Sequence, residues 1–71
     1  MRVSYDKLWK LLEDNLMKKS DLARAAGISK ATITKMNQEK FVSMEIMARF
    51  CKIFHCDIGD VMEIIETDIS V

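Results

Sequence analysis

The chain contains no proline and only two glycines, Gly27 and Gly59. A turn-rich β fold needs more of both residue types, so this scarcity favours short helices that are ended by capping residues. No apolar run approaches the roughly 18 residues that a membrane-spanning helix requires, and the N-terminus has no apolar signal core. The two cysteines, Cys51 and Cys56, do not form a CxxC pair. We therefore expect reduced thiols in a cytoplasmic protein.

The length of the chain limits it to one domain, which we take as residues 1–71. A chain of 71 residues buries only about 60 % of its unfolded surface, so it needs efficient packing or a partner. Apolar residues make up 49 % of the sequence, which is enough to form a small core.

Charge is divided unevenly along the chain, although the formal net charge is zero. Residues 1–40 hold nine Lys and Arg against five Asp and Glu, and residues 41–71 hold two against six. The two parts therefore carry +4 and −4, and only the first can face a polyanion. Asp21 and Glu39 lie within this basic part and are expected to weaken its attraction for phosphate. The alternative interpretation is a chance difference between solvated helix faces.

Capping residues predict five helices and an all-α fold. Ser29, Ser43 and Asp57 are good N-caps, and each follows an apolar residue and has another apolar residue five positions after that one. This repeated pattern is the hydrophobic staple, which fixes the start of a helix. Ser4 can cap the first helix, and Gly27 can end the second. The expected helices cover about residues 5–15, 18–26, 30–38, 44–55 and 58–65.

The two ends of the chain show a different pattern. Residues 1–4 and 67–71 alternate apolar and polar side chains, which is typical of short β-strands. Each such strand needs a partner, and the two can pair with each other within one chain or between two chains. A frayed C-terminal tail is the alternative.

Residues 18–38 contain the pattern of two helices that cross steeply through a tight turn. Ala23 provides the small side chain where the helices touch, and Gly27 tolerates the positive φ that the turn requires. Ile28, Ile33 and Met36 can anchor the second helix from below. The spacing of these five residues predicts a helix-turn-helix.

The sequence LARAAGISKATI over residues 22–33 resembles the core of the helix-turn-helix family of phage Cro and repressor proteins, the XRE-like family. The segments 42–45 and 51–62 resemble the start of its fourth helix and its junction between the fourth and fifth helices. The likeness covers about residues 5–65 and is greatest to short, single-domain regulators of bacteria and mobile elements. It implies a compact five-helix domain that binds DNA, often as a dimer.

The face of the second motif helix that would meet DNA follows from helical geometry. With Ile33 and Met36 on the buried side, the opposite side of helix 29–38 is free to enter the major groove. The residues expected to contact DNA in and around this helix are Lys18, Lys19, Ser29, Lys30, Ala31, Thr32, Thr34, Lys35, Gln38 and Lys40.

Their chemistry divides these residues into two groups. Lys30 and Lys35 can donate to guanine, and Gln38 can bind adenine. Ala31 and Thr34 can contact a thymine methyl group, and Thr32 lies on the flank of the helix. The remaining four are better placed for phosphates, together with the free N–H groups at two helix N-termini. An exposed lysine taken alone is usually a solubilising charge, but lysines clustered around this motif favour DNA contact.

Other chemistries have little support. Cys51, His55 and Cys56 lie close together, but three ligands at this spacing match no zinc pattern and a structural site needs four. The single histidine forms no nucleophile–base pair, and no glycine-rich phosphate loop is present. We therefore expect no enzyme activity, no metal and no cofactor.

The sequence thus predicts a sequence-specific transcriptional regulator of the repressor type, which binds double-stranded DNA as a homodimer. The alternative is a protein-interaction module, an antitoxin or accessory factor, in which the same fold binds another protein through its acidic C-terminal half.

Overall fold

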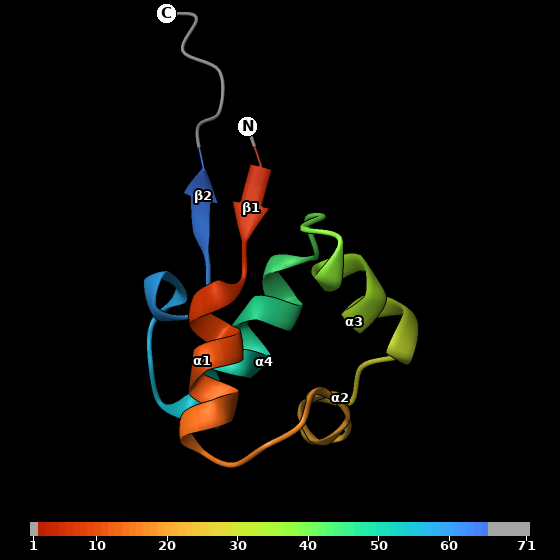
Figure 1. Ribbon diagram of the computed structural model, residues 1–71, viewed down its shortest axis with the longest axis vertical. Helices are drawn as coiled ribbons and strands as arrows, with labels where there is room; N and C mark the ends of the chain where they lie inside the picture. Colours follow the sequence, from red (N-terminus) through yellow and green to blue (C-terminus); the bar gives the residue numbers. More distant parts are fainter. Residues whose placement is uncertain (1, 66–71) are drawn as a thin grey trace, which may run out of the picture.

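Four helices and one two-stranded sheet form the part of the chain that the computed structural model describes, residues 2–65 (Figure 1). A short 3₁₀ turn, Ile58–Asp60, joins the last helix to the last strand. In chain order the elements are β1 (Arg2–Ser4), α1 (Asp6–Asp14), α2 (Lys19–Ala26), α3 (Lys30–Asn37), α4 (Met44–Phe54) and β2 (Glu63–Ile65).

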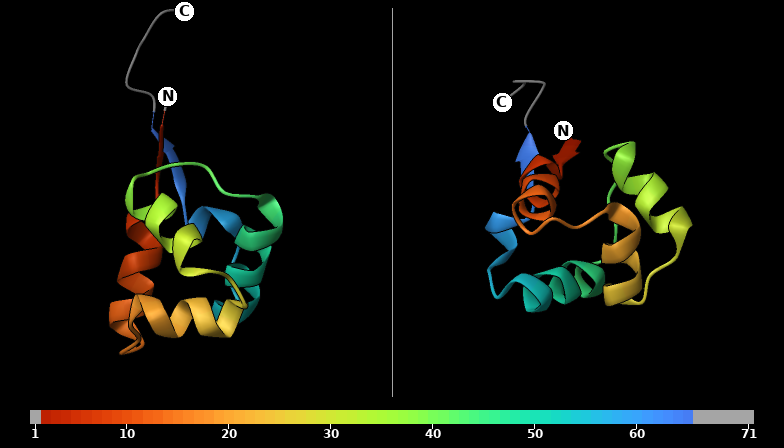
Figure 2. Two further views of the ribbon diagram at one scale, coloured as in Figure 1. Left: turned by 90° about the vertical axis from the view of Figure 1, so that its right-hand side faces the viewer. Right: turned by 60° about the horizontal axis from the view of Figure 1, so that its bottom comes forward.

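The two strands are antiparallel and pair within one chain. Val3 lies opposite Ile64, and Ser4 lies opposite Glu63. The expected N-terminal strand is thereby confirmed, but its partner is residues 63–65, whereas the predicted strand 67–71 lies outside the described residues. The two-stranded sheet and α2 lie at opposite ends of the molecule (Figures 1 and 2).

The predicted fifth helix over 58–65 is wrong. Asp57 does act as an N-cap, accepting a hydrogen bond from the backbone N–H of Ile58, but the turn ends at Asp60 and the chain becomes extended. The apolar residues Val61, Ile64 and Ile65 suit helical spacing, yet they are β-branched and also suit a strand. Pairing with β1 decides between the two, because it satisfies backbone groups of both segments.

The core lies between the four helices and the two-stranded sheet. Helices α2 and α3 stand together on one side of it (Figure 2). Its buried apolar residues are Val3, Tyr5, Leu8, Leu12, Leu22, Ala26, Ile33, Met36, Met47, Phe50 and Val61. Among residues 2–65, no helix has the length and apolar character needed to cross a membrane.

Two of the predicted N-caps are confirmed, one at the start of α3 and one at the start of α4. The hydroxyl of Ser29 accepts a hydrogen bond from the N–H of Thr32 at 3.3 Å, and that of Ser43 accepts from the N–H of Ile46 at 3.2 Å. The first helix starts one residue later than a Ser4 cap would place it, because Tyr5 occupies the cap position.

Candidate nucleic-acid interface

The turn between α2 and α3 has the geometry that the sequence predicts. Gly27 ends α2 with φ at +68°, and the N–H of Ile28 donates to the carbonyl of Ala23 at 3.0 Å. A side-chain Cβ at Gly27 would meet no atom within 4 Å. The turn therefore requires glycine for its backbone conformation and not for lack of space.

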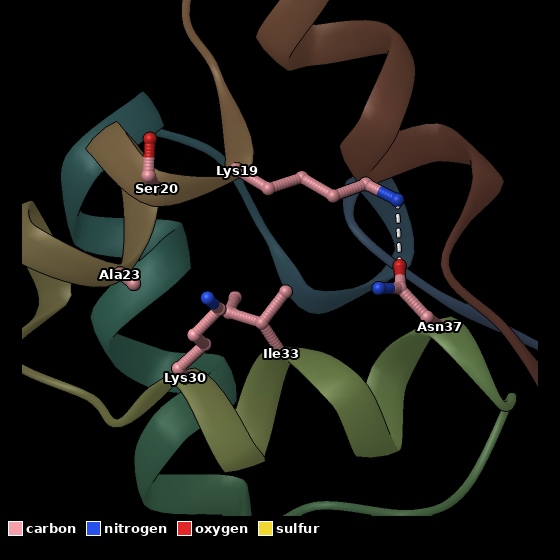
Figure 3. Close-up of a pocket in the computed structure, with 6 residues that line it drawn as sticks. All are labelled: Lys19, Ser20, Ala23, Lys30, Ile33 and Asn37. Carbon is pink, nitrogen blue, oxygen red and sulfur yellow. Dashed lines mark hydrogen bonds between the residues drawn. The ribbon is translucent and has the colours of Figure 1, made fainter.

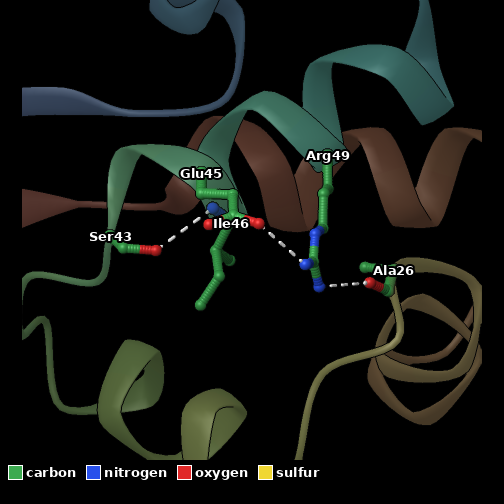
Figure 4. Close-up of polar contacts among 5 residues, drawn as sticks. All are labelled: Ala26, Ser43, Glu45, Ile46 and Arg49. Atoms are coloured by element: carbon green, nitrogen blue, oxygen red, sulfur yellow. Dashed lines mark hydrogen bonds and ion pairs between the residues drawn. The ribbon is translucent and has the colours of Figure 1, made fainter.

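Helix α4 holds the end of α2 in place through Arg49 (Figure 4). One nitrogen of its guanidinium group donates to the carbonyl of Ala26 at 3.2 Å, and another donates to Glu45 at 3.0 Å. The carbonyls in the last turn of a helix lack partners within the helix, and a basic side chain satisfies one of them here. The orientation of the motif is thus fixed to the rest of the domain.

Helix α3 presents a polar face away from the core. Ile33 and Met36 are buried, as expected, and Thr32 is half-buried on the flank. The side chains on the opposite face and at the end of the helix are exposed: Lys30, Ala31, Thr34, Lys35 and Gln38. This arrangement leaves a helix face free to enter a groove, with its N-terminus uncovered.

Local hydrogen bonds determine what three of the expected contact residues can offer. The hydroxyl of Thr34 donates to the carbonyl of Lys30 at 3.1 Å, so its hydrogen is already used within the helix. The hydroxyls of Ser29 and Thr32 lie 3.1 Å apart, and Ser29 also caps α3. Thr34 is therefore suited to an apolar base contact, as the sequence predicts.

The lysines around α3 differ in their surroundings. Lys18 and Lys40 are exposed at the start of α2 and just beyond the end of α3. Lys19 is also exposed, but its ammonium lies 2.6 Å from Oδ1 of Asn37 and 4.1 Å from the centre of the Trp9 ring. Neither Asn37 nor Trp9 belongs to the site that the sequence predicts.

A hollow of about 430 Å³ lies between α2 and α3 (Figure 3). It has basic and polar groups around an apolar floor, and we call it the α2–α3 hollow. The residues that line it are Lys19, Ser20, Ala23, Lys30, Ile33 and Asn37.

Asp21 and Glu39, the two acidic residues expected to weaken phosphate attraction, each lie close to a basic side chain. Asp21 lies 3.6 Å from Arg24 and also accepts a hydrogen bond from the backbone N–H of Lys18. Glu39 lies 3.6 Å from Arg2 of strand β1. These contacts reduce the repulsion that the two carboxylates were expected to exert on phosphate.

The residues considered for a metal do not form a cluster. Within residues 2–65, no group of three or more His, Cys, Asp or Glu side chains is arranged to hold a metal ion. Burial, helped by Cys51 and the nearby Asp60, raises the pKa of the Cys56 thiol above its ordinary value. Cys51 and Cys56 are half-buried and pack against the core as small apolar side chains.

Comparison with known families agrees with this geometry. Residues 7–67 match the model of the Cro/C1-type helix-turn-helix DNA-binding domain. The chain belongs to this family, which confirms the resemblance that the sequence shows.

Among solved structures, the chain is similar to the transcriptional regulator VanUg. The two are 47 % identical and superpose with a TM-score of 0.83. The alignment covers 87 % of this chain and 83 % of that one. A search of curated proteins found no match.

Proposed function

We propose that the protein is a transcriptional regulator of the repressor type that reads a specific DNA sequence with α3, and that it acts by binding rather than by catalysis. One observation carries this proposal: the exposed face of α3 presents Lys30, Lys35 and Gln38 as donors, while Ile33 and Met36 on its other face are buried in the core. The family and the likeness to VanUg, described as a transcriptional regulator, support it.

The proposed contacts divide by chemistry. With α3 in the major groove, Lys30 and Lys35 donate to guanine and Gln38 binds adenine. Ala31 and Thr34 contact thymine methyl groups, while Thr32 supports the start of the helix from the flank.

Phosphate contacts position the helix in the groove. We assign them to Lys18, Lys19, Ser29 and Lys40, which lie at the starts of α2 and α3 and beyond the end of α3. Such contacts fix the register of the protein on DNA but carry no sequence information.

Selection of bound sequences from random duplex DNA, at a stated salt concentration, tests this function. We expect one motif to be enriched and to bind about 10³-fold or more tighter than a scrambled duplex. Enrichment of no motif, with equal and weak binding to every duplex, would contradict the proposal.

We also propose that the protein binds DNA as a homodimer. A single module of this size buries only about 600–1,000 Å² on DNA, whereas a dimer adds the contacts of a second half-site about 34 Å away. The sheet has only two strands, so the outer edge of β2 can extend it into a second copy. Ile64 on this strand is 49 % exposed.

Sedimentation of wild type and of Ile64→Lys tests the dimer. We expect wild type to sediment as a dimer, and the charged side chain to shift it toward monomer and weaken binding to the selected duplex. Lys10→Ala, on an exposed position of α1, is the control. A wild type that remains monomeric at the concentration at which it binds DNA would contradict this part.

A protein partner is the second candidate, which two exposed apolar side chains favour. Phe41 and Met44 are 58 % and 68 % exposed, and they lie close together in the chain where it enters α4. Large apolar side chains at a surface mark interaction sites when they are grouped. If the selection from random duplex DNA enriches no motif, that result would favour protein binding at this surface over sequence reading by α3.

A further inference from the structure

The ammonium of Lys19 already has two contacts within the protein. It lies 2.6 Å from Oδ1 of Asn37 and 4.1 Å from the centre of the Trp9 ring. A lysine side chain normally loses much rotamer freedom when it binds a ligand, and here that freedom is restricted beforehand. Because an ammonium has three N–H donors, the contact with Asn37 leaves others for a second acceptor.

The same contact fixes the orientation of the Asn37 carboxamide. Its oxygen faces the ammonium because its NH₂ group would be repelled there. Figure 3 shows the amide nitrogen turned away from Lys19, toward the space between the helices. Within residues 2–65, no group accepts a hydrogen bond from this nitrogen, so its two N–H bonds remain available at the α2–α3 hollow.

The surroundings of the hollow favour an anion. Ser20 and Lys30 add a hydroxyl and a second ammonium to its rim, and among the described residues no carboxylate lines it. A phosphate diester offers only acceptors, which matches this set of donors. Asn37 lies on the flank of α3, beside the face that carries the proposed base contacts, where the edge of a groove would place the DNA backbone.

We propose that Asn37 is a DNA ligand, and that Asn37 and Lys19 together hold one backbone phosphate at the α2–α3 hollow, with the Trp9 ring as a rigid support behind Lys19. This inference rests on the proposed DNA-binding function and adds residues that the sequence did not indicate.

Three variants on a duplex selected from random DNA test the inference. Asn37→Ala removes the donor and is expected to weaken binding about tenfold, equally for selected and scrambled duplexes, because phosphate contacts carry no sequence information. Asn37→Asp keeps an acceptor for Lys19 but turns a carboxylate toward the phosphate, and we expect a larger loss. Lys52→Ala, which removes an exposed lysine of α4, is the control and should change affinity less than twofold.

Methylphosphonate substitution, which neutralises one phosphate at a time, identifies the contact directly. Neutralisation of one particular phosphate should weaken Asn37→Ala less than it weakens wild type, because the variant has lost one of the two contacts to that phosphate and keeps the contact from Lys19. The thermal unfolding of Asn37→Ala should match that of wild type. Equal losses for both proteins at every position would overturn the inference.

Two other results distinguish a failure of this inference from a failure of the proposed DNA-binding function. Equal or tighter binding by Asn37→Ala would show that Asn37 merely occupies Lys19, which would overturn this inference and leave the DNA-binding function intact. A wild type that selects no duplex would overturn both.

Discussion

The hydroxyl of Tyr5 donates a hydrogen bond to the backbone carbonyl of Lys40 at 2.7 Å, across 35 residues of sequence. Tyr5 is buried at the junction of β1 and α1, and Lys40 lies just after α3. Arg2 and Glu39 form an ion pair beside it at 3.6 Å. Strand β1 and the residue that follows it are therefore tied to the C-terminal end of the proposed recognition helix.

Removal of the Tyr5 hydroxyl should destabilise the domain. Tyr5→Phe leaves the Lys40 carbonyl without this partner, and we expect a loss of about 1–3 kcal/mol in the free energy of unfolding. For a domain of this size, each kcal/mol lowers the melting temperature by about 4–8 °C. Thermal unfolding measures the change, and a melting temperature equal to that of wild type would show that the bond contributes nothing.

The ionisation of Tyr5 should also be linked to folding. Burial raises its pKa above the ordinary value of 10.0 and outweighs the opposing effect of a backbone hydrogen bond from Val42. Because the pKa of Tyr5 is higher in the folded than in the unfolded protein, the neutral phenol contributes to the free energy of unfolding. This contribution is complete below about pH 10 and is lost as the pH rises through the folded pKa.

Tyr5 is the only tyrosine, so phenolate absorbance reports this residue alone. We expect it to ionise at higher pH in the native protein than in urea-unfolded protein. Identical titration curves in the two states would contradict the prediction.

The backbone conformation at two helix ends makes a matched pair of predictions. Gly27 has φ of 68° and Leu16 has φ of 55°, both in the left-handed region. Gly27→Ala should cost about 1 kcal/mol, whereas Leu16→Gly should gain up to about 1 kcal/mol because Leu16 is 94 % exposed and loses few contacts. Chemical denaturation measures both, and changes of the same sign would refute this explanation.

The sequence could predict the features that depend on neighbouring residues. The caps at Ser29 and Ser43 and the positive φ at Gly27 each arise within a few residues of the chain. Each helix is followed within two residues by a residue with a left-handed backbone conformation, but only at Gly27 does the residue type predict it. The helix ends at Leu16, Glu39 and His55 therefore had no comparable signal.

Contacts between distant residues could not be predicted in this way. The segment 63–65 is extended because β1 pairs with it, although its residues also suit a helix. Asn37 enters the site only because packing brings the start of α2, the end of α3 and Trp9 together. A local sequence pattern contains no information about such tertiary contacts. The exposed face of α3, by contrast, follows directly from helical spacing.

Whether α3 reads DNA sequence is tested most directly by how well Lys35→Ala distinguishes a selected duplex from a scrambled one. The measurement is the ratio of affinities for the selected and the scrambled duplex, for wild type, Lys35→Ala and Lys40→Ala, over a series of salt concentrations. We predict that Lys35→Ala lowers this ratio about tenfold or more, because it removes a base contact worth about 1–3 kcal/mol. Lys40→Ala should weaken both duplexes equally and make the salt dependence shallower by about one unit. A Lys35→Ala protein that distinguishes the two duplexes as well as wild type does would contradict sequence reading by α3.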